Sequence, residues 1–196
     1  MPGSVGGAEW GGAGFDPETG MLYVPSVTGT FAADLTPGNP DKMNVRYTRG
    51  TRAFLEGPQG LPPTKPPYGR ITAINMKTGD HVWMVPNGAG PRDHPAIKHL
   101  KVPPLGQPTR DMPLLTKTLF FVAQGDPIMV RTPPGGGHDN LVRAYDKVSG
   151  AVVWETPLPA GANGSPITYM HNGKQYIVVP IGSNTHPGEW VALALP

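Results

Sequence analysis

The sequence contains no cysteine, little net charge and no long apolar run, and each absence excludes a class of protein. Without cysteine there is no disulfide framework, no thiolate metal site and no cysteine nucleophile. The net charge is only +2 and the basic residues are scattered, so a nucleic-acid surface is not indicated. No apolar run approaches the roughly 20 residues that cross a bilayer. The first residues lack the basic start and apolar core of a secretory signal, but a mature or truncated chain would look the same.

Glycine and proline are abundant instead, with 27 and 26 residues in a chain of 196. Between them lie short segments rich in β-branched and aromatic residues, each bounded by Gly, Pro, Asn or Asp. That pattern is typical of short strands joined by turns and irregular loops. The segments are MLYVPSV, GRITAIN, HVWMV, TLFFVA, AVVWET, KQYIVV and WVALAL. The sequence therefore predicts an all-β protein with long Pro- and Gly-rich loops.

An internal repeat is the most informative feature. Residues 73–83 read AINMKTGDHVW and residues 144–154 read AYDKVSGAVVW, so that both copies fit Ala-x-(Asn/Asp)-x-x-(Thr/Ser)-Gly-x-x-x-Trp. Every matched position is offset by 71 residues, and a proline follows each copy. The identical spacing favours two copies of one structural unit.

The residue types of the repeat predict a tight hairpin that carries a wedge. The Asn or Asp can accept hydrogen bonds from the backbone of the turn that follows, and Gly79 and Gly150 suit a position with positive φ. Trp83 and Trp154 are expected to be structural, because a large ring on the outgoing strand can pack against the next sheet. Such a unit buries little by itself, so we expect small antiparallel sheets stacked radially, as in a β-propeller.

The strand-like segments group into two four-stranded blades and one blade with only three strands. An offset of 71 residues exceeds the roughly 40–50 residues of an ordinary blade, and the surplus is assigned to insertions at 88–113 and 131–140. Because an open arc leaves sheet edges unpaired, the chain is expected to be a piece of a larger ring. The predicted strands are 11–15, 21–27, 70–75 and 81–85; then 114–117, 119–123, 141–146 and 152–156; then 167–170, 175–180 and 190–195.

With these motifs the sequence resembles the dehydrogenases that depend on pyrroloquinoline quinone (PQQ), closest to their glucose dehydrogenase branch. The repeat is similar to the tryptophan-docking motif of that family, and GGAEWGGAGFDPETGMLYVP is similar to its Gly-Gly-x-x-Trp-Gly-x-x-x-Phe-Asp-Pro segment. PPYGRITAINMKTGDHVWMVPNG and the final hairpin resemble segments near the family's carboxyl end. The resemblance implies an eight-bladed propeller, of which residues 1–196 would be the carboxy-terminal part of one domain, about two and three-quarter blades.

The resemblance also implies a function, in which the parent protein oxidises a sugar or alcohol with PQQ and Ca²⁺. The electrons would pass to a quinone or cytochrome acceptor, in the periplasm and with a parent that could be anchored to the inner membrane. The catalytic base and the main Ca²⁺ ligands of the family lie upstream of these segments, so no catalytic or metal-binding residue is assigned here. The isolated chain is expected to be inactive and to require the remaining blades as partner.

Three residues are candidates for contact with PQQ. Glu9 and Trp10 stand where the family segment reads Asn-Trp, and a carboxylate in place of the amide would have to be protonated to donate to a quinone oxygen. Asn163 precedes the last hairpin in a loop that could reach the propeller axis, although it also suits a simple turn before Gly164. The alternative to cofactor contact is that Glu9 is solvated and that Trp10 packs between blades.

Other interpretations stay open at this point. The chain could belong to a non-catalytic propeller that acts as a protein-binding scaffold, although its long insertions argue against the lean blades of such proteins. It could also be an inactive truncated product. His94 and His99 are five residues apart beside Asp93, but no third ligand completes a metal pattern, so we expect both histidines on a loop surface.

Overall fold

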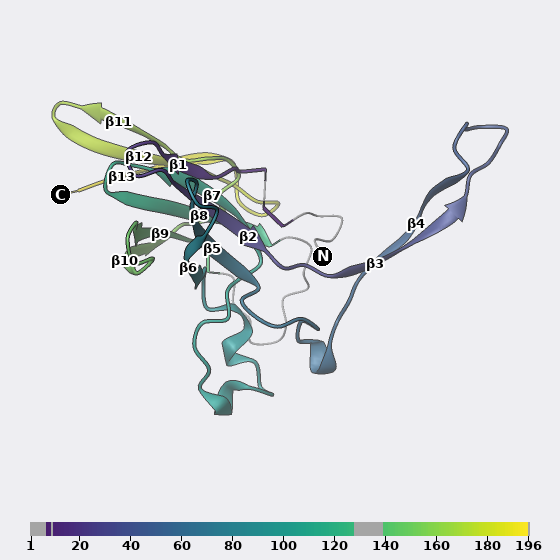
Figure 1. Ribbon diagram of the computed structural model, residues 1–196. Coiled ribbons are helices and arrows are strands. Elements are labelled where there is room, and N and C mark those ends of the chain that lie inside the picture. Colours follow the sequence, from purple (N-terminus) through teal and green to yellow (C-terminus); the bar gives the residue numbers. More distant parts are fainter. Residues whose placement is uncertain (1–6, 9, 128–138, 196) are drawn as a thin grey trace.

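The computed structural model describes residues 7–8, 10–127 and 139–195, which form strands and almost no helix (Figure 1). The helical elements of this described part are three single 3₁₀ turns, and none of them could cross a membrane. They are η1 (Pro58–Gly60), η2 (Gly90–Asp93) and η3 (Lys98–Leu100). The prediction of an all-β fold is confirmed.

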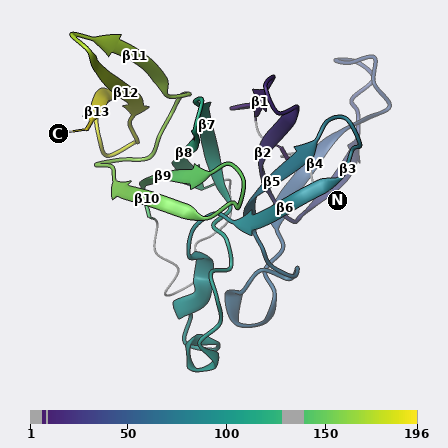
Figure 2. The ribbon, with the colours of Figure 1, turned by 60° about the vertical axis from the view of Figure 1, so that its left-hand side comes forward.

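Most of the strands form three antiparallel sheets, in the numbers that the sequence predicted. Sheet one has the order β1 (Gly14–Asp16), β2 (Met21–Val27), β5 (Gly69–Asn75), β6 (His81–Pro86). Sheet two has the order β7 (Thr109–Leu115), β8 (Leu119–Pro127), β9 (Leu141–Asp146), β10 (Val152–Pro157). Sheet three contains β11 (Ile167–His171), β12 (Lys174–Ile181) and β13 (Glu189–Ala194). Figure 2 shows them side by side like neighbouring blades.

One of the predicted strand boundaries is wrong. Strand β7 begins at Thr109 and not at residue 114, so the insertion before it ends earlier than expected. Arg110, Asp111 and Pro113 obscured this strand in the sequence, because they interrupt the apolar alternation. The second predicted insertion, at 131–140, lies almost wholly outside the described residues.

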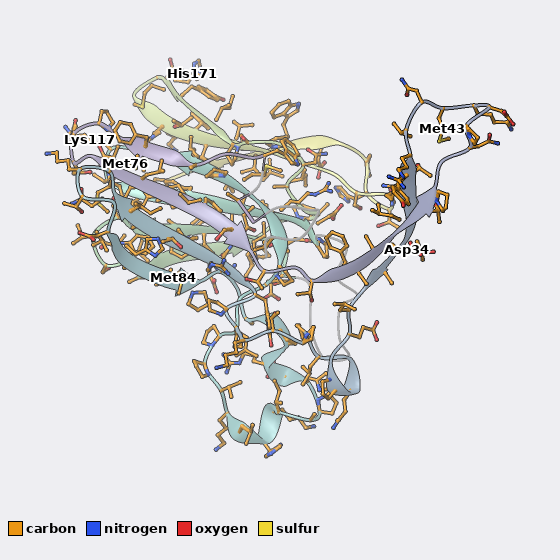
Figure 3. The ribbon with its side chains drawn as sticks, turned by 45° about the vertical axis from the view of Figure 1, so that its right-hand side comes forward. Asp34, Met43, Met76, Met84, Lys117 and His171 are labelled. Carbon is orange, nitrogen blue, oxygen red and sulfur yellow. The ribbon has the colours of Figure 1, made fainter. Side chains whose placement is uncertain are left out.

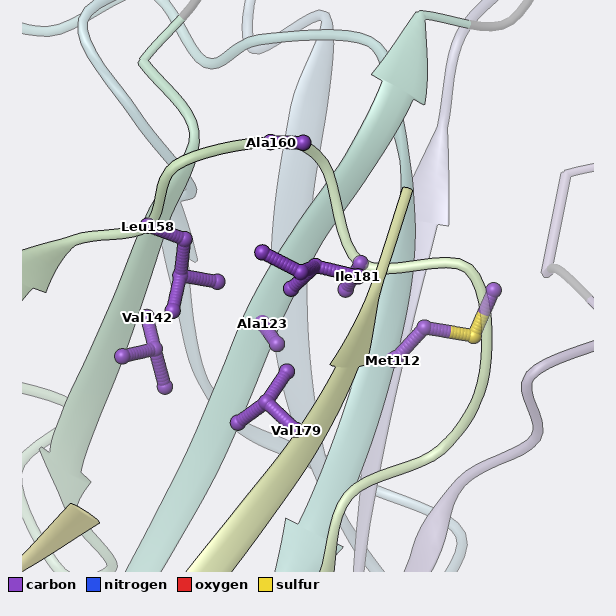
Figure 4. Packing of buried hydrophobic residues seen from close by; sticks show 8 residues of the cluster. Met112, Ala123, Val142, Leu158, Ala160, Val179 and Ile181 are labelled. Carbon is purple, nitrogen blue, oxygen red and sulfur yellow. The ribbon is translucent and has the colours of Figure 1, made fainter. Parts of the chain in front are cut away.

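Sheet two is the middle layer, because its inner strand β8 contributes side chains to a core on each face. Phe120 and Val122 of β8 pack in the core against sheet one, together with Tyr23 and Ile71. The Phe120 ring stacks on that of Tyr23, with 5.3 Å between the ring centroids. Ala123, which follows Val122 in the sequence, points to the other core (Figure 4). That core, against sheet three, contains Met112, Ala123, Val142, Leu158, Ala160, Ala162, Val179 and Ile181.

An additional hairpin, unpredicted from the sequence, interrupts sheet one between β2 and β5. Its strands are β3 (Phe31–Pro37) and β4 (Tyr47–Phe54), which pair with each other and form a separate two-stranded sheet. The hairpin projects away from the three sheets as an arm (Figure 1). Leu35 is 71% exposed and Tyr47 is 51% exposed, so these large side chains contribute little to a core.

The short turns lie at one end of the sheets and the long connections at the other, because the strands alternate in direction. We call these the turn end and the loop end. Figure 3 shows Met76, Lys117 and His171 at the turn end, far from Asp34 and Met43 on the arm. The turns of the repeat have the expected geometry, with φ of 81° at Gly79 and 73° at Gly150.

At the turn end, the two copies of the repeat meet at the boundary between sheets one and two. The indole Nε1 of Trp83 donates to the carbonyl oxygen of Lys147 at 3.2 Å. A Cβ atom on Gly150 would lie 2.8 Å from the Trp83 ring, so the ring rests directly on the turn. The ammonium of Lys147 in turn pairs with Asp16 of sheet one at 2.6 Å. Trp83 therefore wedges sheet one against sheet two, as its place in the repeat suggested.

Candidate functional site

The loop end of the sheets holds a buried polar cluster between sheets one and two. Asn87, which follows β6, donates from Nδ2 to the Asp111 carboxylate at 2.8 Å, and Thr109 donates to the other carboxylate oxygen at 2.7 Å. The hydroxyl of Tyr145 donates to Oδ1 of Asn87 at 2.7 Å. Burial raises the pKa of this phenol above its ordinary value, so it remains a donor.

Arg143 supplies the positive charge of the cluster and is only 5% exposed. Its Nη1 donates to Oε1 of Gln124 at 2.7 Å, and its Nε donates to the half-exposed carboxylate of Glu155 at 2.8 Å. Such a cluster fixes neighbouring strand ends in one arrangement, because each buried group would lose its partner if the sheets slid. Sequence reasoning missed these residues. The polar residues at the start of β7 are a signal for the cluster, but the sequence analysis places them in the insertion at 88–113.

The segment with Trp10 lies against the same strand, β7. Ala8 forms a bridge with Ser26 at the end of β2. A Cβ atom on Gly11 would lie 2.9 Å from the carbonyl oxygen of Asp111, so the backbone can approach β7 only because residue 11 is glycine. Trp10 itself is 68% exposed and is thus not packed between the sheets. Glu9 lies outside the described residues.

Asn163 lies at the loop end of sheet three. Its backbone N–H donates to the carbonyl oxygen of Pro180 at 3.0 Å, which holds the segment beside β12. Its side-chain nitrogen occupies space that Gly182 leaves open, 2.8 Å from where a Cβ atom on that glycine would be. Within the described residues the amide makes no side-chain hydrogen bond, so both its oxygen and its nitrogen remain available to a ligand.

The histidine expectation is half correct. His99 is exposed, but His94 is only 3% exposed. The Nδ1 atom of His94 accepts from the N–H of Ala96 at 3.1 Å, and its Nε2 lies 3.2 Å from the carbonyl oxygen of Gln59. The ring thus ties two loops together, which explains its burial. Among the residues that the structure describes, no group of three or more His, Asp or Glu side chains could hold a metal ion.

A pocket at the base of the arm is a separate feature of the loop end. Its lining includes prolines, glycines and threonines together with Leu55, Glu56 and Tyr68. It includes neither Trp10 nor Asn163. Of the candidates that the structure describes, Trp10 presents an exposed indole on the segment beside β7, and Asn163 presents its amide beside β12. An indole face can stack on a planar ligand, and an amide can donate to or accept from a ligand oxygen.

The stacked four-stranded sheets, with their Trp-bearing turns at one end and an open loop end, define a part of a β-propeller. The family model for "PQQ: Glucose/ethanol/alcohol dehydrogenase, beta-propeller domain" matches residues 1–177. The chain therefore belongs to this family of PQQ propellers.

Curated relatives agree with this family. The chain is 31% identical to the quinoprotein glucose dehydrogenase of Escherichia coli, in an alignment that covers all of the chain and 26% of the relative. It is 30% identical to the quinate/shikimate dehydrogenase (quinone) of Acinetobacter baylyi, over 93% of the chain and 24% of the relative. The chain thus spans about a quarter of the length of these relatives.

Solved structures confirm the fold. The quinohemoprotein alcohol dehydrogenase of Comamonas testosteroni superposes with a TM-score of 0.59 at 21% identity, over 98% of this chain and 27% of the other. A quinohemoprotein alcohol dehydrogenase of Pseudomonas putida gives a TM-score of 0.61 at 21% identity, over 93% of this chain and 23% of the other. At this level of identity the structures establish the architecture alone.

Proposed function

We propose that this chain forms part of a PQQ- and Ca²⁺-dependent dehydrogenase that oxidises a sugar or polyol. The observation that carries the proposal is the match of residues 1–177 to the PQQ propeller family on a fold of stacked four-stranded sheets. The substrate class draws on the relatives, whose names specify glucose, quinate or shikimate, and glycerol. All of these carry several hydroxyl groups. The acceptor would be a quinone or a cytochrome, and the setting the periplasm.

The described residues suit a planar quinone in part. Trp10 offers an exposed ring face for stacking, and Asn163 offers a free amide to a quinone oxygen. When bound, PQQ would accept a hydride from the alcohol carbon, which is chemistry that no side chain can supply. Trp10 and Asn163 would orient the quinone. The base that takes the hydroxyl proton and the Ca²⁺ ligands are expected on the remaining blades.

The buried cluster would serve the site indirectly. Gly11 rests on the backbone of Asp111, whose carboxylate is held by Asn87 and Thr109. Because Asp111 is held by these hydrogen bonds, it would also hold the position of the Trp10 segment relative to β7. Because the Trp10 segment would already be held in place, a planar ligand could bind to the indole without the cost of first ordering that segment.

A chimera tests the proposal. Residues 1–196 would replace the matched quarter of the E. coli glucose dehydrogenase, and the chimera would be loaded with PQQ and Ca²⁺. We expect dye reduction with a sugar or polyol, and a lower affinity for PQQ in the Trp10→Ala chimera. Asn172→Asp, in the turn far from the loop end, is the matched control and should leave PQQ binding unchanged. A chimera with cooperative melting that neither binds PQQ nor reduces dye would refute the proposal.

The isolated chain provides a second measurement if the chimera does not fold. PQQ titrated into the chain should quench tryptophan emission, and the quenching should decrease in Trp10→Phe. A chain that retains a stable protein partner, while PQQ changes neither its emission nor its melting, would favour the non-catalytic scaffold.

A further inference from the structure

The pocket at the base of the arm contains a buried tyrosine that makes no side-chain hydrogen bond. Tyr68 is only 6% exposed and lines the pocket. Among the residues that the structure describes, its hydroxyl has no partner, yet protein atoms do not seal this hydroxyl off. The hydroxyl therefore faces the open space of the pocket. A buried polar group without a partner is costly, so this arrangement indicates a place for a ligand oxygen.

The walls of the pocket are held in place by backbone hydrogen bonds. The N–H of Tyr68 donates to the carbonyl oxygen of Leu105, and the carbonyl oxygen of Tyr68 accepts from the N–H of Thr28, both at 2.8 Å. The N–H of Gly57 donates to the carbonyl oxygen of Leu61 at 2.7 Å, which closes the η1 loop. A Cβ atom on Gly57 would lie 2.7 Å from this oxygen, so the loop closes in this way because residue 57 is glycine. The pocket is thus formed before any ligand binds.

The lining of the pocket combines an apolar surface with a few polar groups. The polar groups include the hydroxyls of Tyr68 and Thr30 and the carboxylate of Glu56. Hydroxyls can both donate and accept, whereas a carboxylate only accepts, so Glu56 requires a donor on the ligand. Burial raises the pKa of the Tyr68 phenol, so this group stays protonated and can donate. The apolar surface is formed by Leu55, Leu61, Pro62, Pro63 and Pro108.

These donors and acceptors distinguish between classes of ligand. A quinone carries only acceptor oxygens, so it would place an acceptor against the Glu56 carboxylate. A hydrocarbon ring would leave the Tyr68 hydroxyl without a partner. A cyclic polyol, such as a sugar in its ring form, meets both requirements. Its hydroxyls can donate to the carboxylate and accept from the phenol, while the C–H groups of its ring pack on the prolines.

We propose that the pocket at the base of the arm is a binding site for a monosaccharide or another cyclic polyol. In this site Tyr68 donates to one ligand oxygen, and Glu56 accepts from a hydroxyl of the same ring. The pocket includes neither Trp10 nor Asn163, so the site is separate from the candidate contacts to PQQ. The inference does not rest on the proposed function, because all of the residues that it uses bind without a cofactor.

A ligand in this site would also stabilise the base of the arm. Thr30 immediately precedes β3 and Leu55 immediately follows β4, and both residues line the pocket. The N–H of Leu55 donates to the carbonyl oxygen of Thr30 at 3.2 Å, which joins the two ends of the arm. A ligand that contacts both residues favours the closed state of this hydrogen bond. Exchange of the Leu55 amide hydrogen should therefore slow when the ligand binds.

Titration of glucose into the full chain without PQQ, followed by the backbone amide resonances, tests the proposal. We expect a Kd of roughly millimolar order, with shifts concentrated at the pocket and slower exchange of the Leu55 amide. Tyr68→Phe removes only the hydroxyl and should weaken glucose binding by roughly tenfold. Glu56→Gln, at an exposed position, should weaken it as well. Tyr47→Phe is the matched control, because this tyrosine lies on the arm outside the pocket, and it should bind glucose as the unmodified chain does.

The results that would overturn the proposal are distinct from those that would overturn the proposed dehydrogenase. Cyclohexanone, an apolar ring with one acceptor oxygen, is the comparison ligand. Equal affinity for cyclohexanone and glucose would show that the site does not select hydroxyl groups, and the proposal would be wrong. It would also be wrong if glucose shifts no pocket resonance, or if Glu56→Gln binds glucose as tightly as the unmodified chain. The last comparison decides the matter even if Tyr68→Phe does not fold. Dye reduction by the chimera enters none of these measurements.

Discussion

Replacing Gly150 by alanine tests whether the contact of Trp83 with the turn holds sheets one and two together. Gly150 has φ of 73°, a region where L-residues are strained. An added Cβ atom would lie 2.8 and 2.9 Å from two carbons of the Trp83 ring, which is closer than carbon atoms approach. The ring or the turn must shift.

Gly79 is the matched control, because it occupies the same position in the first copy of the repeat. Its φ is 81°, and a Cβ atom there would meet nothing within 4 Å. Both substitutions carry the backbone strain, about 1–2 kcal/mol, and both restrict the unfolded chain equally. Only Gly150→Ala adds the overpacking against Trp83, about 1–3 kcal/mol. The difference between the two variants therefore isolates the inter-sheet contact.

Urea unfolding followed by far-UV circular dichroism and tryptophan emission measures this difference. We expect Gly150→Ala to lose about 1–3 kcal/mol more than Gly79→Ala, with a melting temperature lower by about 2–4 °C for each kcal/mol. Equal losses in the two variants, with unchanged Trp83 emission, would show that the ring does not rest on the turn and would refute the reasoning.

Two further predictions concern the polar groups between sheets one and two. The hydrogen bond from the Lys147 side chain lowers the pKa of Asp16 from its ordinary 3.8 to about 2. The stabilisation from this pair should therefore be complete above pH 3.8 and lost as the pH falls toward 2. Asp16→Asn should flatten the acid side of a plot of unfolding free energy against pH, and an unchanged acid side would contradict the pairing. Tyr145→Phe removes the 2.7 Å hydrogen bond to Asn87 and should lower the free energy of unfolding by about 1–2 kcal/mol in urea titration, whereas Tyr169→Phe, on an exposed strand of sheet three, should change it little.

Much of the fold followed from local signals in the sequence. The turn at Asn172 and Gly173 has positive φ at both residues, as expected for the favoured hairpin pair. Asp146 accepts hydrogen bonds from the backbone of Val148 and Ser149, as its place in the repeat predicted. Short-range turn chemistry determines these features, so a single sequence reveals them.

The arm and the polar cluster were not predictable in the same way. In β3 and β4, Ala, Asp, Gly and Arg interrupt any alternation, because neither face of the arm has to be buried. Asp111 and Arg143 resemble surface residues until the sheets are packed, since they lie 24 and 56 residues from their shared partner Asn87. His94 is buried for the same reason, through a contact with a loop 35 residues away. Long-range pairing leaves no period in the sequence.

The separation of the turn end from the loop end has a consequence for how this molecule can change. Lengthening a connection at the loop end, as the arm does within sheet one, leaves the register of the flanking strands β2 and β5 intact. A single residue added to a turn of the repeat would move the glycine out of its positive-φ position or, at Gly150, move it away from the Trp83 ring. Added residues should therefore be tolerated at the loop end, where the candidate residues Trp10 and Asn163 lie, and should be destabilising at the turn end, where the sheets are joined.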